Sequence, residues 1–260
     1  MLWTLISCFL AVTTSVVLMF LVRSIPKAKK FKFSEEAVGL HFLSIGTIYA
    51  VLLAFMLTSV WQKYEEISTI SEREANYLMG VFRLAQGMSE PESSNIRQAA
   101  RQYAQDVIEQ EWPGMAKGEI EFGALDTANR LWRAIQTAQP KTRHDEMLYT
   151  ELLSRQANMA ESRRIRLFRS NEGLPTLLWA VLIMGAILTI SLSFVLEVHS
   201  PRMHILLVSL LTLIITLELL AIHGLSTPFS GSMPLQPTGF RQSMKKMDRL
   251  YQQERSAQSP

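Results

Sequence analysis

The stretch "IGTIYAVLLAFMLTSVWQKYEE", residues 45–66, passes from an apolar run directly into charged residues. Neither glycine nor proline follows Gly46 within it, so no residue stops a helix at the polar boundary. The apolar part belongs to a block long enough to cross a hydrocarbon core of about 30 Å. The stretch therefore predicts one helix, from about Ala37 to Met88, that leaves the membrane and continues into water. The alternative is a kink near Trp61, an interfacial tryptophan that marks the membrane boundary.

Four apolar blocks of this kind determine the fold class. Each has about the 20 helical residues that a span needs, and blocks of this length indicate helices rather than barrel strands. We therefore predict an all-α, multi-pass protein of the cell membrane whose partner is the lipid bilayer. The predicted spans are Leu2–Val22, Ala37–Trp61, Pro175–Val198 and His204–His223.

The spans divide the chain into four predicted parts. They are a first transmembrane hairpin (1–61) with a basic linker (23–36), an extramembrane helical bundle (62–174), a second hairpin (175–224) and a polar tail (225–260). In the bundle, apolar residues return at a spacing of three and four with a gap at Glu74, which is typical of packed helices. We expect one bundle helix to end at Trp112–Gly114, where proline and glycine follow each other. Another should start near Thr142, with Asp145 at capping-box spacing.

The basic linker bears on orientation. Short loops rich in lysine and arginine stay in the cytoplasm, so this linker favours a cytoplasmic position with the bundle outside. Basic residues at the ends of the bundle oppose that interpretation, and the orientation stays open. The linker residues concerned are Arg23, Lys27, Lys29, Lys30 and Lys32.

No motif in the sequence indicates an enzyme. There is no phosphate-binding glycine loop, no HExxH and no nucleophile elbow, so we expect no catalytic residue. The one cysteine, Cys8, cannot form a disulfide within the chain or a thiolate cluster, and we expect neither metal nor cofactor. The formal charge of +3 gives no reason to expect nucleic acid, because the basic residues lie mainly beside the spans.

Glu218 lies several residues inside the fourth predicted span. A carboxylate in lipid is costly, so such a group faces the protein interior, water or a partner. It indicates either an ion or proton path, or a neutral acid that serves packing. Both interpretations stay open.

Four arginines, Arg163, Arg164, Arg166 and Arg169, stand just before the third span. The first interpretation is contact with lipid headgroups. The second is a funnel that concentrates small inorganic anions at a pore mouth.

The second span offers candidates for the lining of a pore. Large apolar residues around an oligomeric pore can gate it by dewetting. The same stripes are also typical of ordinary helix packing, with Gly46 allowing close approach. The pore-lining candidates are Gly46, Tyr49, Leu53, Phe55 and Met56.

Six motifs between Ala37 and Phe240 together resemble the bestrophin-like membrane proteins. They are the opening stretch, "EREAN", "YAQDVIEQEWPGM", "RRIRLF", "LPTLLWAVLIMGA" and "HGLSTPFSGSMPLQPTGF". The positions that match the family pattern, which gives them no roles, are Gly46, Tyr49, Phe55, Trp61, Glu74, Trp112, Arg166, Pro228, Phe229 and Gly231.

The resemblance implies a homo-oligomeric anion channel, since bestrophins proper are pentameric channels with four spans and a helical domain after the second. It implies that the second span lines the pore and that the helical domain is cytoplasmic, against the charge of the linker. The calcium-sensing acidic cluster of bestrophins is reduced here to Asp248 and Glu254, so calcium gating is not expected. The rival hypothesis is a membrane-anchored sensor or scaffold whose bundle binds a partner without conduction.

Overall fold

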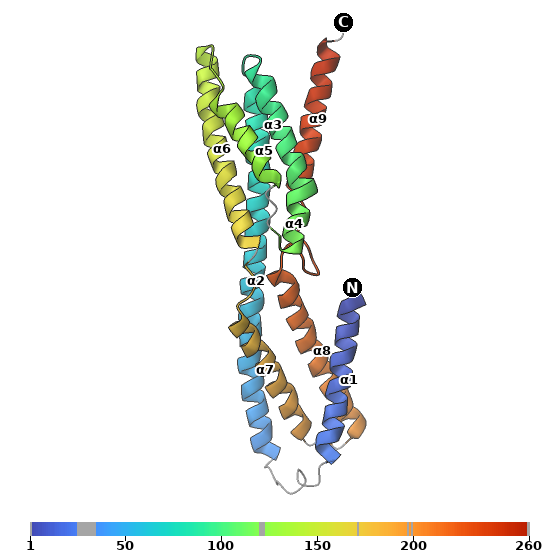
Figure 1. Ribbon diagram of the computed structural model, residues 1–260. Coiled ribbons are helices and arrows are strands. Elements are labelled where there is room, and N and C mark those ends of the chain that lie inside the picture. The colour runs from blue at the N-terminus through green and yellow to red at the C-terminus, as the bar shows by residue number, and fades with distance from the viewer. Residues whose placement is uncertain are drawn as a thin grey trace. The chain divides into compact units, whose positions relative to one another are not determined.

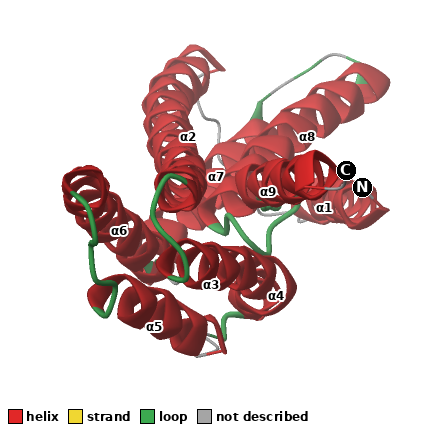
Figure 2. Cartoon of the chain, turned by 90° about the horizontal axis from the view of Figure 1, so that it is seen from above, coloured by secondary structure: helices red, strands yellow, loops and turns green. Residues whose placement is uncertain are grey.

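The computed structural model describes residues 2–24, 35–119, 123–170, 172–196, 198 and 200–258. Within these ranges the chain consists of helices and loops and contains no strand (Figures 1 and 2). It divides into two compact units, which are described separately. The first unit is Met1–Lys63 with Gly173–Ser226, and the second is Tyr64–Glu172 with Thr227–Pro260. Residues 25–34, which hold most of the predicted basic linker, lie outside the described residues.

Four helices build the first unit: α1 (Leu2–Ser24), the first part of α2 (Glu35–Gln86), α7 (Thr176–Val195) and α8 (Pro201–Ser226). Each contains a segment long and apolar enough to cross a membrane, with mean hydropathy between 2.0 and 2.7. The predicted all-α fold with four spans is confirmed, and the chain is a multi-pass membrane protein.

The helices of the first unit pack through a small core. Helix α1 runs along α8, and α7 contacts both. Met19, Phe194 and Val208 form a buried apolar cluster between these three helices. Thr212 donates a hydrogen bond of 3.0 Å to the Ser15 hydroxyl, so the α1–α8 contact also satisfies a polar pair.

A close approach joins α2 to α7 in the first unit. The Tyr49 hydroxyl donates a 2.9 Å hydrogen bond to the Leu182 carbonyl, one turn before Gly185. A Cβ added at Gly185 would lie 2.5 Å from two ring carbons of Tyr49. Glycine is therefore required at 185, because the aromatic ring occupies the space of a side chain.

Helix α2 is continuous for 52 residues, from Glu35 to Gln86, which confirms the predicted continuity. Residues 47–79 contain neither glycine nor proline, so each backbone N–H can keep its partner along the whole segment. The helix contributes residues to both units.

The second unit adds α3 (Glu92–Asp106), a π-helical turn η2 (Val107–Glu111), α4 (Trp112–Lys117), α5 (Gly123–Gln136), α6 (Arg143–Ser170) and α9 (Thr238–Gln258). Helices α3 and α9 lie side by side (Figure 1). Apolar side chains from six helices, α2, α3, α4, α5, α6 and α9, meet in one core. Its fully buried members include Ile67, Leu78, Phe82, Ile96, Tyr103, Leu131, Ile135 and Leu152.

The predicted helix end at Trp112–Gly114 is wrong. The chain stays helical through these residues, and α4 ends at Gly118, whose φ is +75°. The π-helical turn directly before α4 changes the hydrogen-bond register, and Pro113 lies in the first turn of α4. Proline suits a first-turn position because its fixed φ matches that of a helix.

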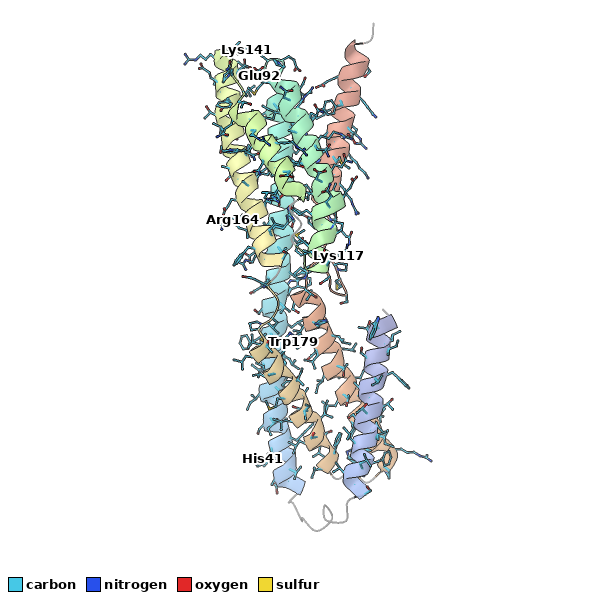
Figure 3. The ribbon with its side chains drawn as sticks, in the orientation of Figure 1. His41, Glu92, Lys117, Lys141, Arg164 and Trp179 are labelled. Carbon is cyan, nitrogen blue, oxygen red and sulfur yellow. The ribbon has the colours of Figure 1, made fainter. Side chains whose placement is uncertain are left out.

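The predicted cap at the start of α6 is confirmed. The Asp145 N–H donates to the Thr142 hydroxyl at 3.1 Å, and the Thr142 N–H donates to Asp145 Oδ2 at 3.2 Å. Asp145 also accepts hydrogen bonds from the Ser89 hydroxyl and N–H, which ties the α2–α3 turn to α6. At the same end of this unit, Lys141 lies 3.3 Å from Glu92 (Figure 3).

The last helix, α9, belongs to the second unit. Its two acidic residues each pair with an arginine of α3: Glu254 with Arg97 at 2.6 Å and Asp248 with Arg101 at 2.7 Å. The carboxylates considered above for calcium therefore take part in the packing of α9 on α3.

We expect Gly185→Ala to lower the free energy of unfolding by about 1–3 kcal/mol, the usual cost of overpacking, because the Tyr49 ring must move. The matched control is Gly46→Ala, where a Cβ would meet nothing within 4 Å. Thermal unfolding of the purified protein in detergent measures both. Equal melting temperatures for the two variants would contradict the predicted contact.

The hydrogen bonds to Asp145, first that from the Ser89 hydroxyl, lower its pKa from 3.8 to about 2. A carboxyl whose pKa is lower in the folded state stabilises the fold above its unfolded pKa, and this contribution disappears as the pH falls through the folded value. We expect the stability difference between the wild type and Asp145→Asn to be full above pH 4 and to shrink towards pH 2. Unfolding midpoints across this range test it, with the exposed Asp126→Asn as the control. A difference that stays constant with pH would show that Asp145 is not the linked group.

Candidate functional site

Three of the predicted pore-lining residues lie inside the first unit. Tyr49, Leu53 and Met56 share one face of α2 and are buried, and we call them the inner stripe. Tyr49 is the residue held against α7 at Gly185. The inner stripe is thus buried within its own subunit, which agrees with the helix-packing alternative, and its role in a pore stays a prediction.

The opposite face of α2 is open. Phe55, on this face, is 69% exposed. Gly46 lies one turn before Tyr49 on the inner-stripe side, where an added Cβ would meet nothing within 4 Å. Thr47, Val51 and Thr58 are also exposed and share the face of Phe55 at a spacing of three and four residues. We call Thr47, Val51, Phe55 and Thr58 the outer stripe. Sequence reasoning missed its threonines, although hydroxyls within an apolar run were a signal for them.

The outer-stripe threonines satisfy their hydroxyl protons within the helix. Thr47 donates to the Leu43 carbonyl at 2.7 Å, and Thr58 donates to the Ala54 carbonyl at 2.8 Å. Their oxygens still have free lone pairs that can accept hydrogen bonds from water. The outer stripe thus combines one large aromatic ring with two hydroxyl groups.

Glu218 lies on α8 in the first unit and is partly buried. Its carboxyl group is close enough to Tyr49 to interact with it electrostatically. One turn further along α8, His223 packs edge-on against Trp179 at 5.8 Å between ring centroids. The ion-path and packing interpretations of Glu218 both stay predictions.

Arg166 is the most deeply buried of the four arginines, with no exposed surface. Its Nε donates to Glu74 Oε2 at 2.7 Å and its Nη2 to Glu74 Oε1 at 2.9 Å, a bidentate pair. Nη2 also contacts Glu111 Oε1 at 2.5 Å. The guanidinium therefore joins α6 to α2 and to the π-helical turn.

Arg163 completes this network, whereas Arg164 is exposed and Arg169 is half-buried. Arg163 Nη2 donates to Glu111 Oε2 at 2.5 Å, so two cations face two carboxylates in the core. Arg164 points outward from α6 and pairs with Glu161 (Figure 3). Arg169 pairs with Glu66 at 3.1 Å. Of the four, only Arg164 and Arg169 present their charge to solvent.

The neighbouring charges of the network shift the pKa values of Glu111 and Arg166. Burial alone would raise the pKa of Glu111, but Arg166 and Arg163 outweigh it and hold that pKa below its usual range. Burial alone would lower the pKa of Arg166, but Glu74 and Glu111 hold it well above its usual value. Both shifts favour the charged forms of Glu111 and Arg166.

Aromatic residues enclose the network. Tyr103 donates a 2.6 Å hydrogen bond to Glu74, and burial followed by the charges of Glu74 and Glu111 raises the pKa of Tyr103 well above its ordinary value. The Arg166 guanidinium lies over the rings of Trp112 and Phe240, at 5.4 and 5.9 Å. Glu74, Trp112 and Arg166, which the sequence matched to a family pattern without assigned roles, thus meet at one point.

We expect Arg166→Met to lower the free energy of unfolding by about 3–5 kcal/mol, because it leaves Glu74 buried without its partner. The exposed Arg164→Met, its matched control, should cost no more than about 1 kcal/mol. The double variant Arg166→Met/Glu74→Gln should recover part of the lost free energy of unfolding. It removes the unpaired carboxylate of Glu74 and keeps the ion pair of Arg163 with Glu111. Unfolding in detergent measures all three. A loss for Arg166→Met no larger than that for Arg164→Met would rule out the network as the main polar support of this core.

The fold resembles solved structures over nearly its whole length. A bacterial bestrophin homologue from Klebsiella pneumoniae carrying a point mutation aligns with a TM-score of 0.71 at 10% identity, covering 94% of this chain and 97% of that one. A second point mutant of a Klebsiella pneumoniae bestrophin homologue aligns with a TM-score of 0.71 at 9% identity. The alignment covers 94% of this chain and 98% of that chain. A third structure, described as a membrane protein, aligns with a TM-score of 0.70 at 9% identity. A search of the curated proteins finds no match.

A family model described as a Bestrophin-like domain matches residues 8–240, which is most of the chain. This match covers every motif on which the resemblance was based, and it includes both stripes of α2 and the buried network. The chain belongs to the bestrophin-like family.

Proposed function

We propose that copies of this chain assemble around an axis into a pore that conducts anions and is lined by the outer stripe of α2. The observation that carries the proposal is the exposure of α2. Within its most apolar segment 11% of residues are buried inside the subunit, against 17–28% for the other three spans. A span so little covered by its own subunit is free to face a common axis. Family membership and the likeness to bestrophin homologue structures support this role.

Phe55 is the proposed constriction. A ring of phenylalanine side chains, one from each subunit, would narrow the pore and exclude water unless it opened. The threonines on either side of Phe55 provide hydroxyl oxygens that keep ions hydrated up to that point. Gly46 lies on the other side of α2, with Tyr49 and Leu53, and its place in a pore lining stays a prediction.

We propose the anion-attracting role for Arg164 and Arg169 alone. Arg163 and Arg166 are neutralised by two buried carboxylates and have no charge to offer an ion in solution. The ion pairs of Arg164 and Arg169 are exposed and therefore weak, so these two side chains can still attract anions at low salt.

Recording from purified protein in planar bilayers tests the pore. We expect unitary currents whose reversal potential follows the chloride gradient, and a severalfold larger conductance for Phe55→Ala because the narrowest ring is removed. The matched control is Phe9→Ala on α1, an equally exposed ring on another span, which should leave conductance unchanged.

An intact oligomer that stays silent at all voltages, pH values and calcium concentrations would overturn the proposal. That outcome would favour the rival function, a membrane-anchored scaffold. Crosslinking to a partner protein would then identify what the second unit binds.

A further inference from the structure

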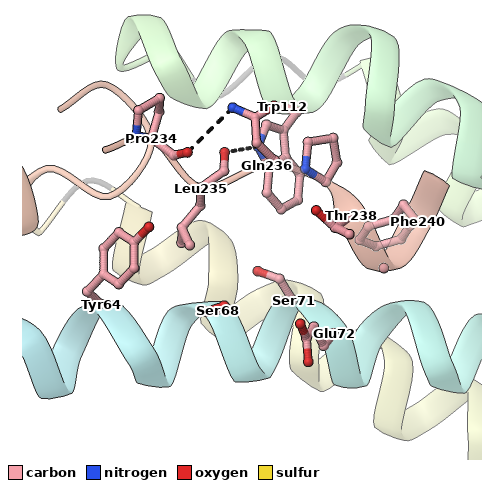
Figure 4. A pocket seen from close by; sticks show the side chains of 12 residues that line it. Tyr64, Ser68, Ser71, Glu72, Trp112, Pro234, Leu235, Gln236, Thr238 and Phe240 are labelled. Carbon is pink, nitrogen blue, oxygen red and sulfur yellow. Dashed lines mark hydrogen bonds between the residues drawn. The ribbon is translucent and has the colours of Figure 1, made fainter. Parts of the chain in front are cut away.

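We propose that the second unit binds a small organic compound through its primary ammonium group, in a cavity between α2 and the segment that leads into α9. The cavity has a volume of about 240 Å³. Figure 4 shows residues of α2 on one side and residues 234–240 on the other. This volume suits a molecule of several non-hydrogen atoms rather than a bare ion.

The walls of the cavity are held in place by the protein's own hydrogen bonds. Trp112 Nε1 donates to the Leu235 carbonyl at 2.9 Å (Figure 4), and the Tyr64 hydroxyl donates to the Met233 carbonyl at 3.1 Å. At the far end of the segment, a Cβ added at Gly239 would lie 3.1 Å from that of Ala75, so the segment sits tightly on α2 there. The site is therefore shaped before a ligand arrives, which reduces the entropic cost of binding.

The lining carries one negative charge, and its hydroxyl and amide groups can both donate and accept hydrogen bonds. Glu72 is the single ionisable carboxylate among the lining residues, and none of them is lysine, arginine or histidine. Ser68, Ser71 and Glu72 lie on one face of α2 at a spacing of three and four residues. Pro234 and Pro237 on the opposite wall have no backbone N–H to donate. One carboxylate and no cationic side chain among the lining residues favour a positively charged donor over an anion.

The arrangement fits an ammonium group better than a metal ion. An ammonium has three N–H donors, and Glu72, Ser68 and Thr238 line the cavity with oxygens that can accept hydrogen bonds. Divalent cations need more charged oxygen ligands than this cavity contains. The rings of Trp112 and Phe240 offer apolar surface to the carbon part of the ligand. Arg166 lies against both rings, but Glu74 and Glu111 balance its charge.

Titration calorimetry of the full chain in phosphatidylcholine nanodiscs tests the site, with propylamine, which is protonated at pH 7, as the probe. We expect saturable binding of propylammonium and none of 1-propanol, which has the same shape without the charge. Glu72→Gln should weaken binding by at least about tenfold, since it removes the charge and keeps the side chain's size. Glu65→Gln changes another exposed glutamate of the same helix and should bind as the wild type does.

A second set of nanodiscs identifies the source of the ammonium group. If phosphatidylethanolamine in the bilayer abolishes propylammonium binding, the lipid headgroup is the ligand. If binding persists, the ligand is a free amine. Absence of propylammonium binding in phosphatidylcholine, equal binding of 1-propanol, or equal affinities of Glu72→Gln and Glu65→Gln would each overturn the proposal. Because binding is measured without any current, the result is independent of whether the protein conducts.

Discussion

The packing of the helices in the second unit depends on one buried charge, the guanidinium of Arg166. A guanidinium without exposed surface is very unfavourable unless carboxylates surround it, and Arg166 has Glu74 from α2 and Glu111 from the π-helical turn. Both carboxylates must reach the same point, which fixes the axial position of α6 against α2 and against the start of α4. The π-helical turn is part of this arrangement because it supplies Glu111 directly before Trp112, the ring over which the guanidinium lies. An apolar core alone would allow these helices to slide by a turn, but a bidentate ion pair does not.

The sequence predicted the elements of the fold well where one physical requirement determined the local structure and no other signal contradicted it. Four long apolar blocks predict four spans, because lipid accepts few other structures. The continuity of α2 followed from the absence of glycine and proline between its apolar and charged parts. The cap at Thr142 and Asp145 followed from spacing alone, because both partners are local.

The sequence did not show which side chains face which neighbour. The periodicity of α2 predicts two stripes, but a stripe turned toward α7 and a stripe turned away from it have nearly the same composition. Tyr49 is buried because Gly185, more than a hundred residues later in the chain, leaves room for its ring. Glu74 was visible as a gap in an apolar pattern. A charged residue on a face that packs calls for an opposite charge, and Arg166 could have been sought on that ground. The continuation of the helix through Pro113 depends on a π-helical turn, for which the sequence carries no comparable signal.

The contact between Tyr49 and Gly185 limits how the second span can move. The ring fills the space left by the missing side chain, and its hydroxyl is bonded to the backbone of α7. A rotation of α2 about its own long axis would break the hydrogen bond between Tyr49 and Leu182. It would also push the Tyr49 ring into the backbone of α7. A rotation of α2 alone is therefore excluded, and α2 and α7 must turn together as one rigid pair.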